Sequence, residues 1–306
     1  MVTKIIYHQV KPGVDCPDGI WSAFVAKRKF PDAEVVGWCY SHSDSPVIPL
    51  AEKGDRLIIV DFSFPESVYK QWAEQGIETL TIDHHKTAWD ELSTLRLKNN
   101  AIANLLNINK TKMRFDLNES GATLTWKYFY PWQSVPPILE YVRDRDLWNH
   151  KLHRTKEIHE AIASLRSQYR KQGRDVFKLF ASLIELSREQ LLAIFEPIGK
   201  DLLHEKFREI LAIAQTYYWG KLDEYTVPCI ELDCRSDRLV SDIGSHLNKT
   251  LQPLFVVVVT SDGQFHLRSD KNGSDFDVSA IAKKHGGGGH RNAAGFSENN
   301  NEEKYG

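Results

Sequence analysis

The sequence predicts an α/β protein with a mainly parallel sheet in an N-terminal domain, a helical linker, and a smaller mixed α/β domain at the C-terminus. Two observations support this prediction. Over the first 90 residues, apolar β-prone runs alternate with segments of helical pattern, and strands separated by helices form parallel βαβ units. Near the C-terminus, β-prone runs instead follow one another across short turns. We place the three parts at residues 1–186, 187–224 and 225–306.

The N-terminal elements follow from the apolar runs and their boundary residues. Pro65 stands near the start of a helical pattern and Gly76 stands at its end, which are typical helix boundaries. Because parallel sheets bind ligands outside the carboxyl ends of their strands, we expect polar residues at those ends to matter. The predicted strands are residues 4–8, 33–40, 55–63 and 78–83, and the predicted helices are residues 18–30 and 65–76.

The middle of the chain is predicted to be largely helical. Ser120 is a capping residue for a helix over 121–130, and a second apolar helix covers 136–150. Residues 187–219 have a long amphipathic pattern, which predicts a helical linker that is broken or bent near Pro197 and Gly199. Further along, "TSDGQ" between two β-prone runs predicts a hairpin at residues 260–264.

Composition limits the classes of function that this protein can have. Among the 306 residues the formal net charge is −2, so no overall basic field favours long nucleic acid, whereas a short nucleic acid held by a local patch remains compatible. The four cysteines lack a paired zinc spacing, which favours reduced thiols. We find no signal-peptide pattern and no apolar run of membrane-spanning length, and therefore expect a cytoplasmic protein without membrane partners.

Four segments place side chains that commonly ligate metals just after apolar runs. Carboxylate and imidazole together suit a cation such as manganese, whereas thiolate would favour zinc. So many carboxylates could converge only if cations neutralised them, and two cations about 3.5–4 Å apart can clamp phosphoryl oxygens and activate a water. The residues are His8, Asp15 and Asp18; then Asp61; then Asp83, His84 and His85; and finally Asp144 and Asp146.

Each of these residues also has an ordinary structural interpretation. A single aspartate after a strand is usually a helix cap or a turn former, which applies to Asp18 and Asp61. Asp144 and Asp146 stand beside arginines and could form surface ion pairs. The joint occurrence of four such segments at element ends favours the metal site.

A glycine-rich segment, "KKHGGGGHRNAAGF", lies near the C-terminus. Consecutive glycines let a chain approach a ligand closely and expose backbone N–H groups, although such runs are more often flexible loops. Here the run lies between an amphipathic segment and an apolar strand, and His290 and Arg291 follow it, which predicts a phosphate-binding element. Arg268 is a second candidate anion contact, because guanidinium matches phosphate bidentately.

In this order the motifs resemble the DHH phosphoesterase superfamily, and more narrowly its members with a C-terminal DHHA1 domain. The likeness runs from His8 to Phe296. The motifs that carry it are "YH…DCPDG", "VDFS", "IDHH", "DRDLW", "LRS" and "GGGGHRNAAGF".

The resemblance implies a DHH domain and a DHHA1 domain around an interdomain cleft, with two Mn²⁺ ions for which Mg²⁺ or Co²⁺ could substitute. Asp61 would bridge both ions. Asp83 would orient a neighbouring imidazole, and His85 would face the scissile phosphate. The implied metal ligands are His8, Asp15, Asp18, Asp61, His84 and Asp146, with Asp144 as the alternative to Asp146. The implied substrate-binding residues are Arg268, Ser269, Gly287, Gly288, Gly289, His290 and Arg291.

One departure from the family pattern concerns the first motif. Asp15 and Asp18 stand seven and ten residues after His8, further than in many members, because "KPGV" lengthens the loop. Among the implied ligands, Asp15 is therefore the one that the pattern supports least.

The implied function is a manganese-dependent phosphodiesterase that cleaves phosphate esters of short oligonucleotides or small nucleotides with a water activated by two metals. Cyclic dinucleotides and a 3′-phosphorylated nucleotide are within this range, long duplex DNA is not expected, and a homodimer is left open. The alternatives are a RecJ-like single-strand exonuclease, which should need a basic groove, and a non-catalytic nucleotide-binding sensor.

Overall fold

The computed structural model describes residues 2–39, 51–93 and 111–297. Within the chain, two compact units can be distinguished, Met1–Leu203 and His204–Gly306, and each is described by itself. The predicted division at residues 186 and 224, with an interdomain cleft, stays a prediction. In the described part of the chain, no helix combines the length and the apolar character needed to cross a membrane.

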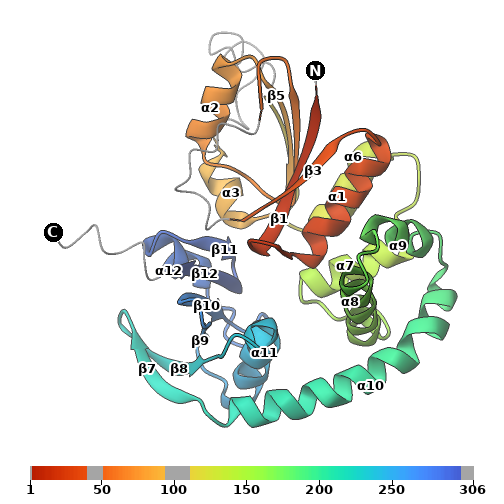
Figure 1. The fold of residues 1–306 in the computed structure, drawn as a ribbon. Coiled ribbons are helices and arrows are strands. Elements are labelled where there is room, and N and C mark those ends of the chain that lie inside the picture. Colours follow the sequence, from red (N-terminus) through yellow and green to blue (C-terminus); the bar gives the residue numbers. More distant parts are fainter. Residues whose placement is uncertain (1, 40–50, 94–110, 298–306) are drawn as a thin grey trace. The chain divides into compact units, whose positions relative to one another are not determined.

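The N-terminal unit is an α/β structure built on a parallel sheet, as predicted (Figure 1). Its strands are β1 Thr3–Lys11, β2 Val14–Asp15, β3 Glu34–Trp38, β4 Arg56–Val60, β5 Glu78–Asp83 and β6 Thr111–Phe115. Its helices are α1 Pro17–Lys29, α2 Glu66–Glu74, α3 Lys86–Glu91, α6 Gly121–Phe129, α7 Pro137–Asp146, α8 Thr155–Lys171 and α9 Val176–Leu183; α10, Arg188–Ala214, continues into the C-terminal unit.

Strand order explains why polar residues distant in the sequence meet at one edge. The order is β2-β1-β4-β5-β6, with β3 also paired to β1. Strands β3, β1, β4, β5 and β6 run parallel, and only β2 is antiparallel to its neighbour. The carboxyl ends of β1, β4 and β5 therefore lie next to one another in the middle of the sheet.

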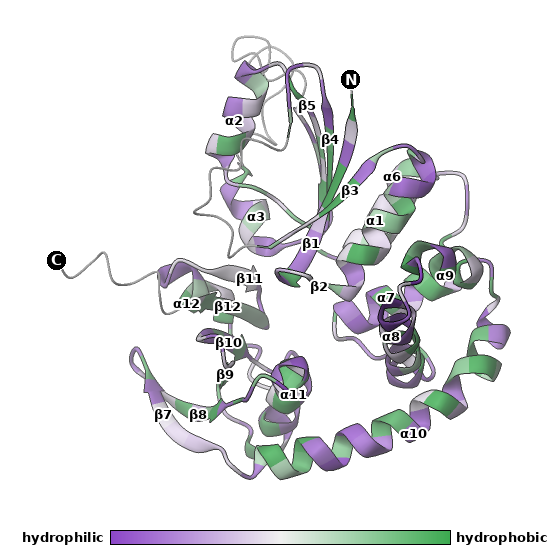
Figure 2. Cartoon of the chain, viewed as in Figure 1, coloured by the Kyte–Doolittle hydropathy of each residue, from purple (hydrophilic) through white to green (hydrophobic). Residues whose placement is uncertain are grey.

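Alternation along the central strands buries both faces of this sheet. Ile58 and Val60 of β4 belong to the core beneath α1, whereas Leu57 and Ile59 belong to the core beneath α2. This alternation is the period of two expected for a strand covered on both sides, and β4 is almost entirely hydrophobic in Figure 2. The sheet is thereby a rigid base for the residues that follow it.

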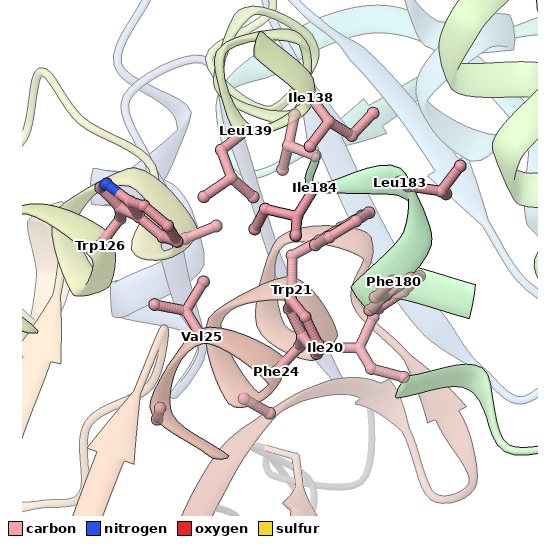
Figure 3. Packing of buried hydrophobic residues seen from close by; sticks show 14 of the residues in the cluster. Ile20, Trp21, Phe24, Val25, Trp126, Ile138, Leu139, Phe180, Leu183 and Ile184 are labelled. Atoms are coloured by element: carbon pink, nitrogen blue, oxygen red, sulfur yellow. The ribbon is translucent and has the colours of Figure 1, made fainter. Parts of the chain in front are cut away.

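The helical layer beside α1 is anchored by aromatic packing. Trp21 of α1 stacks on Phe180 of α9, with ring centroids 3.8 Å apart (Figure 3). Both side chains are buried, and Phe24 packs edge-on against Phe180. Because α1 carries Asp18 in its first turn, this packing fixes the position of that carboxylate relative to the sheet.

Two features differ from the expectation. The helix α10 continues through Pro197 without a break, so that of the predicted break or bend only the bend stays a prediction. Gly199 has a packing role, because a Cβ there would lie 2.0 Å from the carbonyl oxygen of Glu157. The strand β6 was not predicted, since its alternating Lys112 and Arg114 mask the apolar pattern. The predicted strand over residues 33–40 corresponds to β3, and its last residue lies outside the described residues.

The C-terminal unit is a smaller mixed α/β structure, as predicted. Its strand order is β11-β12-β10-β9-β8-β7, in which β8 and β9 are parallel and the other pairs antiparallel. The hairpin predicted at residues 260–264 joins β9 to β10, and β7 lies within the range assigned to the linker. The elements are β7 Tyr218–Leu222, β8 Tyr225–Glu231, α11 Val240–Leu251, β9 Val256–Val259, β10 Gln264–Arg268, α12 Val278–Lys284, β11 Gly288–His290 and β12 Ala293–Ser297.

Candidate metal centre

The carboxyl edge of the parallel sheet gathers most of the predicted ligands into one buried cluster. His8 lies in β1, Asp61 directly follows β4, and His84 directly follows β5. Helix α1 adds Asp18 from its first turn, and α7 adds Asp146 as its last residue. Five of the six predicted ligands are thereby in contact through a chain of short distances.

Asp61 lies at the centre of this cluster. Its Oδ1 lies 2.9 Å from Nε2 of His84, and its Oδ2 lies 3.4 Å from Nδ1 of His8. Its backbone has a φ of 57°, in the left-handed region, and its N–H donates to the carbonyl of Ile82 on the neighbouring strand. The unusual turn directs the carboxylate across the end of the sheet instead of along β4.

Gly121, the first residue of α6, leaves room for the Asp61 side chain. A Cβ at position 121 would lie 2.6 Å from Cβ and 2.7 Å from Oδ1 of Asp61. Both distances are shorter than those at which a Cβ atom approaches other non-bonded atoms in proteins. Any larger residue would therefore push Asp61 out of place.

The N-terminus of α6 also binds Asp18. The backbone N–H groups of Gly121 and Ala122 donate to its two carboxylate oxygens at 2.5 and 3.0 Å. These are the unpaired donors at a helix start, which favour an anion. Burial nevertheless raises the pKa of Asp18 well above its usual value, and the nearby carboxylates of Asp61 and Asp146 raise it further. This cluster is thus short of positive charge.

Asp146 and Asp144 have different surroundings. Oδ2 of Asp146 lies 3.6 Å from Nε2 of His84, so this carboxylate lies at the cluster. Asp144 instead accepts hydrogen bonds from the backbone N–H groups of Lys151 and Leu152 and from the hydroxyl of Thr155. It therefore stabilises the connection between α7 and α8.

Asp83 supports the two histidines that follow it. One of its oxygens accepts a hydrogen bond from the backbone N–H of His84 and lies 2.7 Å from Nδ1 of His85. Its other oxygen accepts from the hydroxyl of Ser63 at 2.6 Å. Burial opposes its ionisation, but the charge and hydrogen bonds of His85 outweigh it and lower the pKa of Asp83. The arrangement orients the His85 ring through Nδ1, as expected for a supporting carboxylate.

Asp15 is the predicted ligand that the structure does not bring to the cluster. The residues after His8 form a hairpin, in which Asp15 of β2 pairs with Gln9 of β1. Asp15 accepts hydrogen bonds from the Tyr7 hydroxyl and the Gln9 amide and forms an ion pair with Arg170. Tyr7 and Gln9 lie on one face of β1, whereas His8 points to the other.

The donor set and its surroundings fit divalent cations. Among the described residues of the N-terminal unit, three groups of side chains have ligand atoms within 4.8 Å of one another. Among the residues that the structure describes, the buried oxygens Asp61 Oδ2 and Asp146 Oδ2 accept no hydrogen bond. Asp61 Oδ2 faces Nδ1 of His8 at 3.4 Å and Asp146 Oδ2 faces Nε2 of His84 at 3.6 Å, and a bound cation would satisfy these buried oxygens better than such long contacts do. The three groups are Asp18, Asp61 and His84; Asp61, Asp83 and His85; and His8, Cys16 and Asp61.

In the C-terminal unit, the predicted anion contacts are held by protein groups. The Arg268 guanidinium donates to the carbonyls of Leu267 and Ala294 and to the hydroxyl of Ser241. The Ser269 hydroxyl donates to the carbonyl of Phe276. Both residues thus help to hold the sheet and its covering segments together.

The glycine-rich segment forms an edge strand. Gly288, Gly289 and His290 make up β11, which pairs with β12 at one end of the sheet. A Cβ at Gly287 would lie 2.1 Å from the carbonyl oxygen of Gly295, and Gly289 has a φ of 135°, so close pairing itself requires these glycines. Arg291 is half exposed and interacts with Asp275 and Asp277.

Three residues at the centre were not predicted from the sequence. Cys16 precedes α1 and lies with His8 and Asp61, Gly121 accommodates Asp61, and Ser63 bonds to Asp83. For Cys16, one indication was present in the sequence: it stands between Asp15 and Pro17, the first residue of α1, and so lies beside a predicted ligand. The contacts of Gly121 and Ser63 are tertiary and leave no local pattern.

Comparison with known proteins gives distant similarities. No protein-family model matches the chain. The chain is 28% identical over 315 residues to the uncharacterized protein R106 of Acanthamoeba polyphaga mimivirus, spanning 97% of this chain and 67% of that protein.

Three solved structures are similar to nearly the whole chain. A pGpG-specific phosphodiesterase from Vibrio cholerae is 13% identical with a TM-score of 0.47, covering 97% of this chain and 93% of its own. RecJ from Thermus thermophilus in complex with Mn²⁺ is 14% identical with a TM-score of 0.43, and this chain, 97% of which is covered, spans 49% of it. A DHH domain described as belonging to a family of ribosomal proteins is 15% identical with a TM-score of 0.49, covering 99% of this chain and 84% of its own.

Cation binding to this centre should release protons. The neighbouring carboxylates of Asp146 and Asp61 overcome the effect of burial and raise the pKa of His84 well above its usual value, so the cation-free imidazole is protonated near neutral pH. Because only a neutral imidazole ligates a metal, affinity for Mn²⁺ should rise with pH until this pKa is passed. Calorimetric titration with Mn²⁺ in two buffers of different ionisation enthalpy measures the released protons, and binding without proton release would contradict the expectation.

Proposed function

We propose that this chain, which resembles the DHH phosphoesterase superfamily in the order of its motifs, is a metal-dependent phosphoesterase acting on short oligonucleotides or small nucleotides. The observation that carries the proposal is the convergence of Asp18, Asp61, His84 and Asp146 with His8 at the carboxyl edge of the parallel sheet. Buried carboxylates this close disfavour one another's ionisation, and two divalent cations would supply the positive charge that stabilises them.

The residues divide the task of holding two cations between them. His8 lies beside one oxygen of Asp61 and His84 lies beside the other, and Asp18 and Asp146 both lie close to the same nitrogen of His84. Two bound divalent cations would supply an activated water and neutralise the phosphoryl oxygens. We assign them as Mn²⁺, with Mg²⁺ or Co²⁺ as substitutes, because oxygen and imidazole ligands suit these ions.

His85 is the residue that we assign to the scissile phosphate. Its Nδ1 is held by Asp83, and Asp83 is in turn held by Ser63, so the ring has a fixed orientation. The charge of Asp83 outweighs burial and raises the pKa of His85, which favours the imidazolium form. An imidazolium beside the cluster would stabilise the charge that develops on a phosphoryl oxygen during cleavage.

The C-terminal unit carries the proposed nucleotide-binding element. Arg291 is half exposed, and its contacts with Asp275 and Asp277 are surface ion pairs of the kind that contribute little, so the guanidinium can exchange them for a phosphate. We assign Gly287, Gly288, Gly289 and His290 to the same element, with Arg268 and Ser269 supporting it through β10 and β12.

A hydrolysis panel tests the proposal and ranks the substrates. Purified protein with Mn²⁺ would be given a dinucleotide RNA, a cyclic dinucleotide, 3′-phosphoadenosine 5′-phosphate, pyrophosphate and a 5′-labelled single-stranded DNA. We expect hydrolysis of one or more of the three small nucleotides and loss of activity after chelation. Preference for the DNA would identify an exonuclease, and tight binding without turnover of any substrate would identify a nucleotide sensor; either result contradicts the proposal.

Removing the two side chains after the glycine run should weaken nucleotide binding without blocking the chemistry. Loss of a charged hydrogen bond is worth about 1.5–3 kcal/mol, so the paired changes His290→Ala and Arg291→Ala should raise KM for a nucleotide substrate about 10-fold or more. Turnover of a small activated phosphodiester should be retained. Equal losses on both substrates would contradict a substrate-binding role, and Arg235→Ala, a change of an arginine that has no assigned role, is the matched control.

A further inference from the structure

We propose that Cys16, not Asp15, binds the cation on the His8 side of Asp61, together with His8 and Asp61. This cation position then prefers a thiophilic ion such as Zn²⁺ or Co²⁺. The inference rests on the proposed metal centre and changes the chemistry of one of its two positions. It follows from two independent observations. The hairpin directs the Asp15 side chain away from the cluster, and the Cys16 sulfur lies close to His8 and Asp61.

Hairpin geometry directs Asp15 away from the cluster. Asp15 is paired with Gln9, and side chains of paired residues lie on the same face of a hairpin. The Asp15 carboxylate accordingly bonds to Gln9 and Tyr7, while His8, between them in the chain, points to the opposite face. The ion pair with Arg170 neutralises the buried Asp15 carboxylate, so it needs no cation.

Cys16 lies beside His8 and Asp61, where Asp15 was expected. It stands at the N-cap of α1, and its side chain makes no capping hydrogen bond. Its Sγ, a nitrogen of His8 and an oxygen of Asp61 all lie within 4.8 Å of one another, a spacing in which a single cation can reach all three. The three residues come from β1, the start of α1 and the end of β4, so the fold itself brings them together.

The residue types at the two positions predict different metal preferences. A thiolate with an imidazole and a carboxylate favours Zn²⁺ or Co²⁺ over Mn²⁺, because soft sulfur ligands bind these ions more strongly. The other group, Asp18, Asp61 and His84, offers only oxygen and nitrogen and suits Mn²⁺. One tightly bound thiophilic ion and one exchangeable ion are therefore expected in each chain.

Cobalt spectroscopy tests this assignment without relying on activity. Cation-free protein would be titrated with Co²⁺, and a thiolate ligand would produce a charge-transfer absorption in the near ultraviolet. We expect this band in the unchanged protein, in Asp15→Asn and in the control Cys39→Ser, and its loss in Cys16→Ser. In Cys16→Asp the band should be absent while two Mn²⁺ ions per chain still bind, which shows that the variant is folded and the centre intact.

The preference for zinc provides a second measurement. In Cys16→Asp, the ratio of Zn²⁺ to Mn²⁺ affinity should fall by more than the roughly 10–100-fold that loss of an outer partner of a ligand costs. A full cobalt band in Cys16→Ser would overturn the inference, as would loss of cation binding in Asp15→Asn alone. A protein that binds cobalt through Cys16 but hydrolyses no phosphoester would instead contradict the proposed function and leave this inference standing.

Discussion

Asp61→Asn is expected to lower kcat/KM by more than about 10³-fold, the upper range for loss of one group that stabilises a transition state. Its two carboxylate oxygens face His84 on one side and His8 on the other, which is the placement that a bridging ligand requires. Asparagine tolerates the left-handed backbone at this position and keeps the shape of the side chain, so the fold should survive. Hydrolysis of the best nucleotide from the panel, together with counting of bound Mn²⁺, measures the effect.

Asp144→Asn is the matched control for this change. Asp144 is buried like Asp61 but accepts its hydrogen bonds from Lys151, Leu152 and Thr155. Weakening these bonds should lower the free energy of unfolding by about 1–3 kcal/mol while leaving the affinity for Mn²⁺ unchanged. Turnover of Asp61→Asn at the level of the unchanged protein would refute the two-cation centre, and loss of Mn²⁺ binding in Asp144→Asn would refute the choice of Asp146 over Asp144.

Gly121→Ala is expected to reduce hydrolysis by at least about 10²-fold, although it adds a single methyl group. The new Cβ would lie 2.6 Å from Cβ of Asp61, so the carboxylate must shift, and a displacement of about 1 Å in a catalytic group can lower the rate 10²-fold. Overpacking should also destabilise the fold by about 1–3 kcal/mol. Affinity for Mn²⁺, the hydrolysis rate and the thermal midpoint would be measured together.

Gly273→Ala is the control for the added methyl group. Position 273 lies in the C-terminal unit, and the atoms nearest to a Cβ there belong to the Asp270 side chain, at 3.2 Å or more. It should leave Mn²⁺ affinity and hydrolysis unchanged. Unaltered Mn²⁺ affinity in Gly121→Ala would mean that Asp61 can move without consequence, contrary to its central position.

Much of the fold could be predicted from the sequence because its elements have local causes. The apolar run of β4, the capping Ser120 of α6 and the turn between β9 and β10 all depend on neighbours in the chain. The two departures in regular structure have one local and one tertiary reason. Charged residues masked the apolar pattern of the edge strand β6. Phe195, before Pro197, and Ile210, after it, pack into separate hydrophobic cores, and these tertiary contacts stabilise α10 against the helix-breaking preference of proline.

The candidate centre was predictable in part, for a reason that lies in the topology. Once the strands were taken as parallel, His8, Asp61 and His84 were bound to meet at one edge, because the carboxyl ends of adjacent parallel strands lie together. The assignment of Asp15, in contrast, depended on a loop whose hairpin form could not be inferred from its composition.

By itself, the sequence determined which residue types are available for metal chemistry and which ends of the sheet they occupy. Only the tertiary structure decided which of two neighbouring residues faces the cluster. Cys16 meets His8 and Asp61 while Asp15 turns to Arg170, and Asp146 meets His84 while Asp144 turns to Thr155. The physical reason is that strand pairing, helix starts and helix ends set the direction of each side chain, and these directions depend on contacts far apart in the chain.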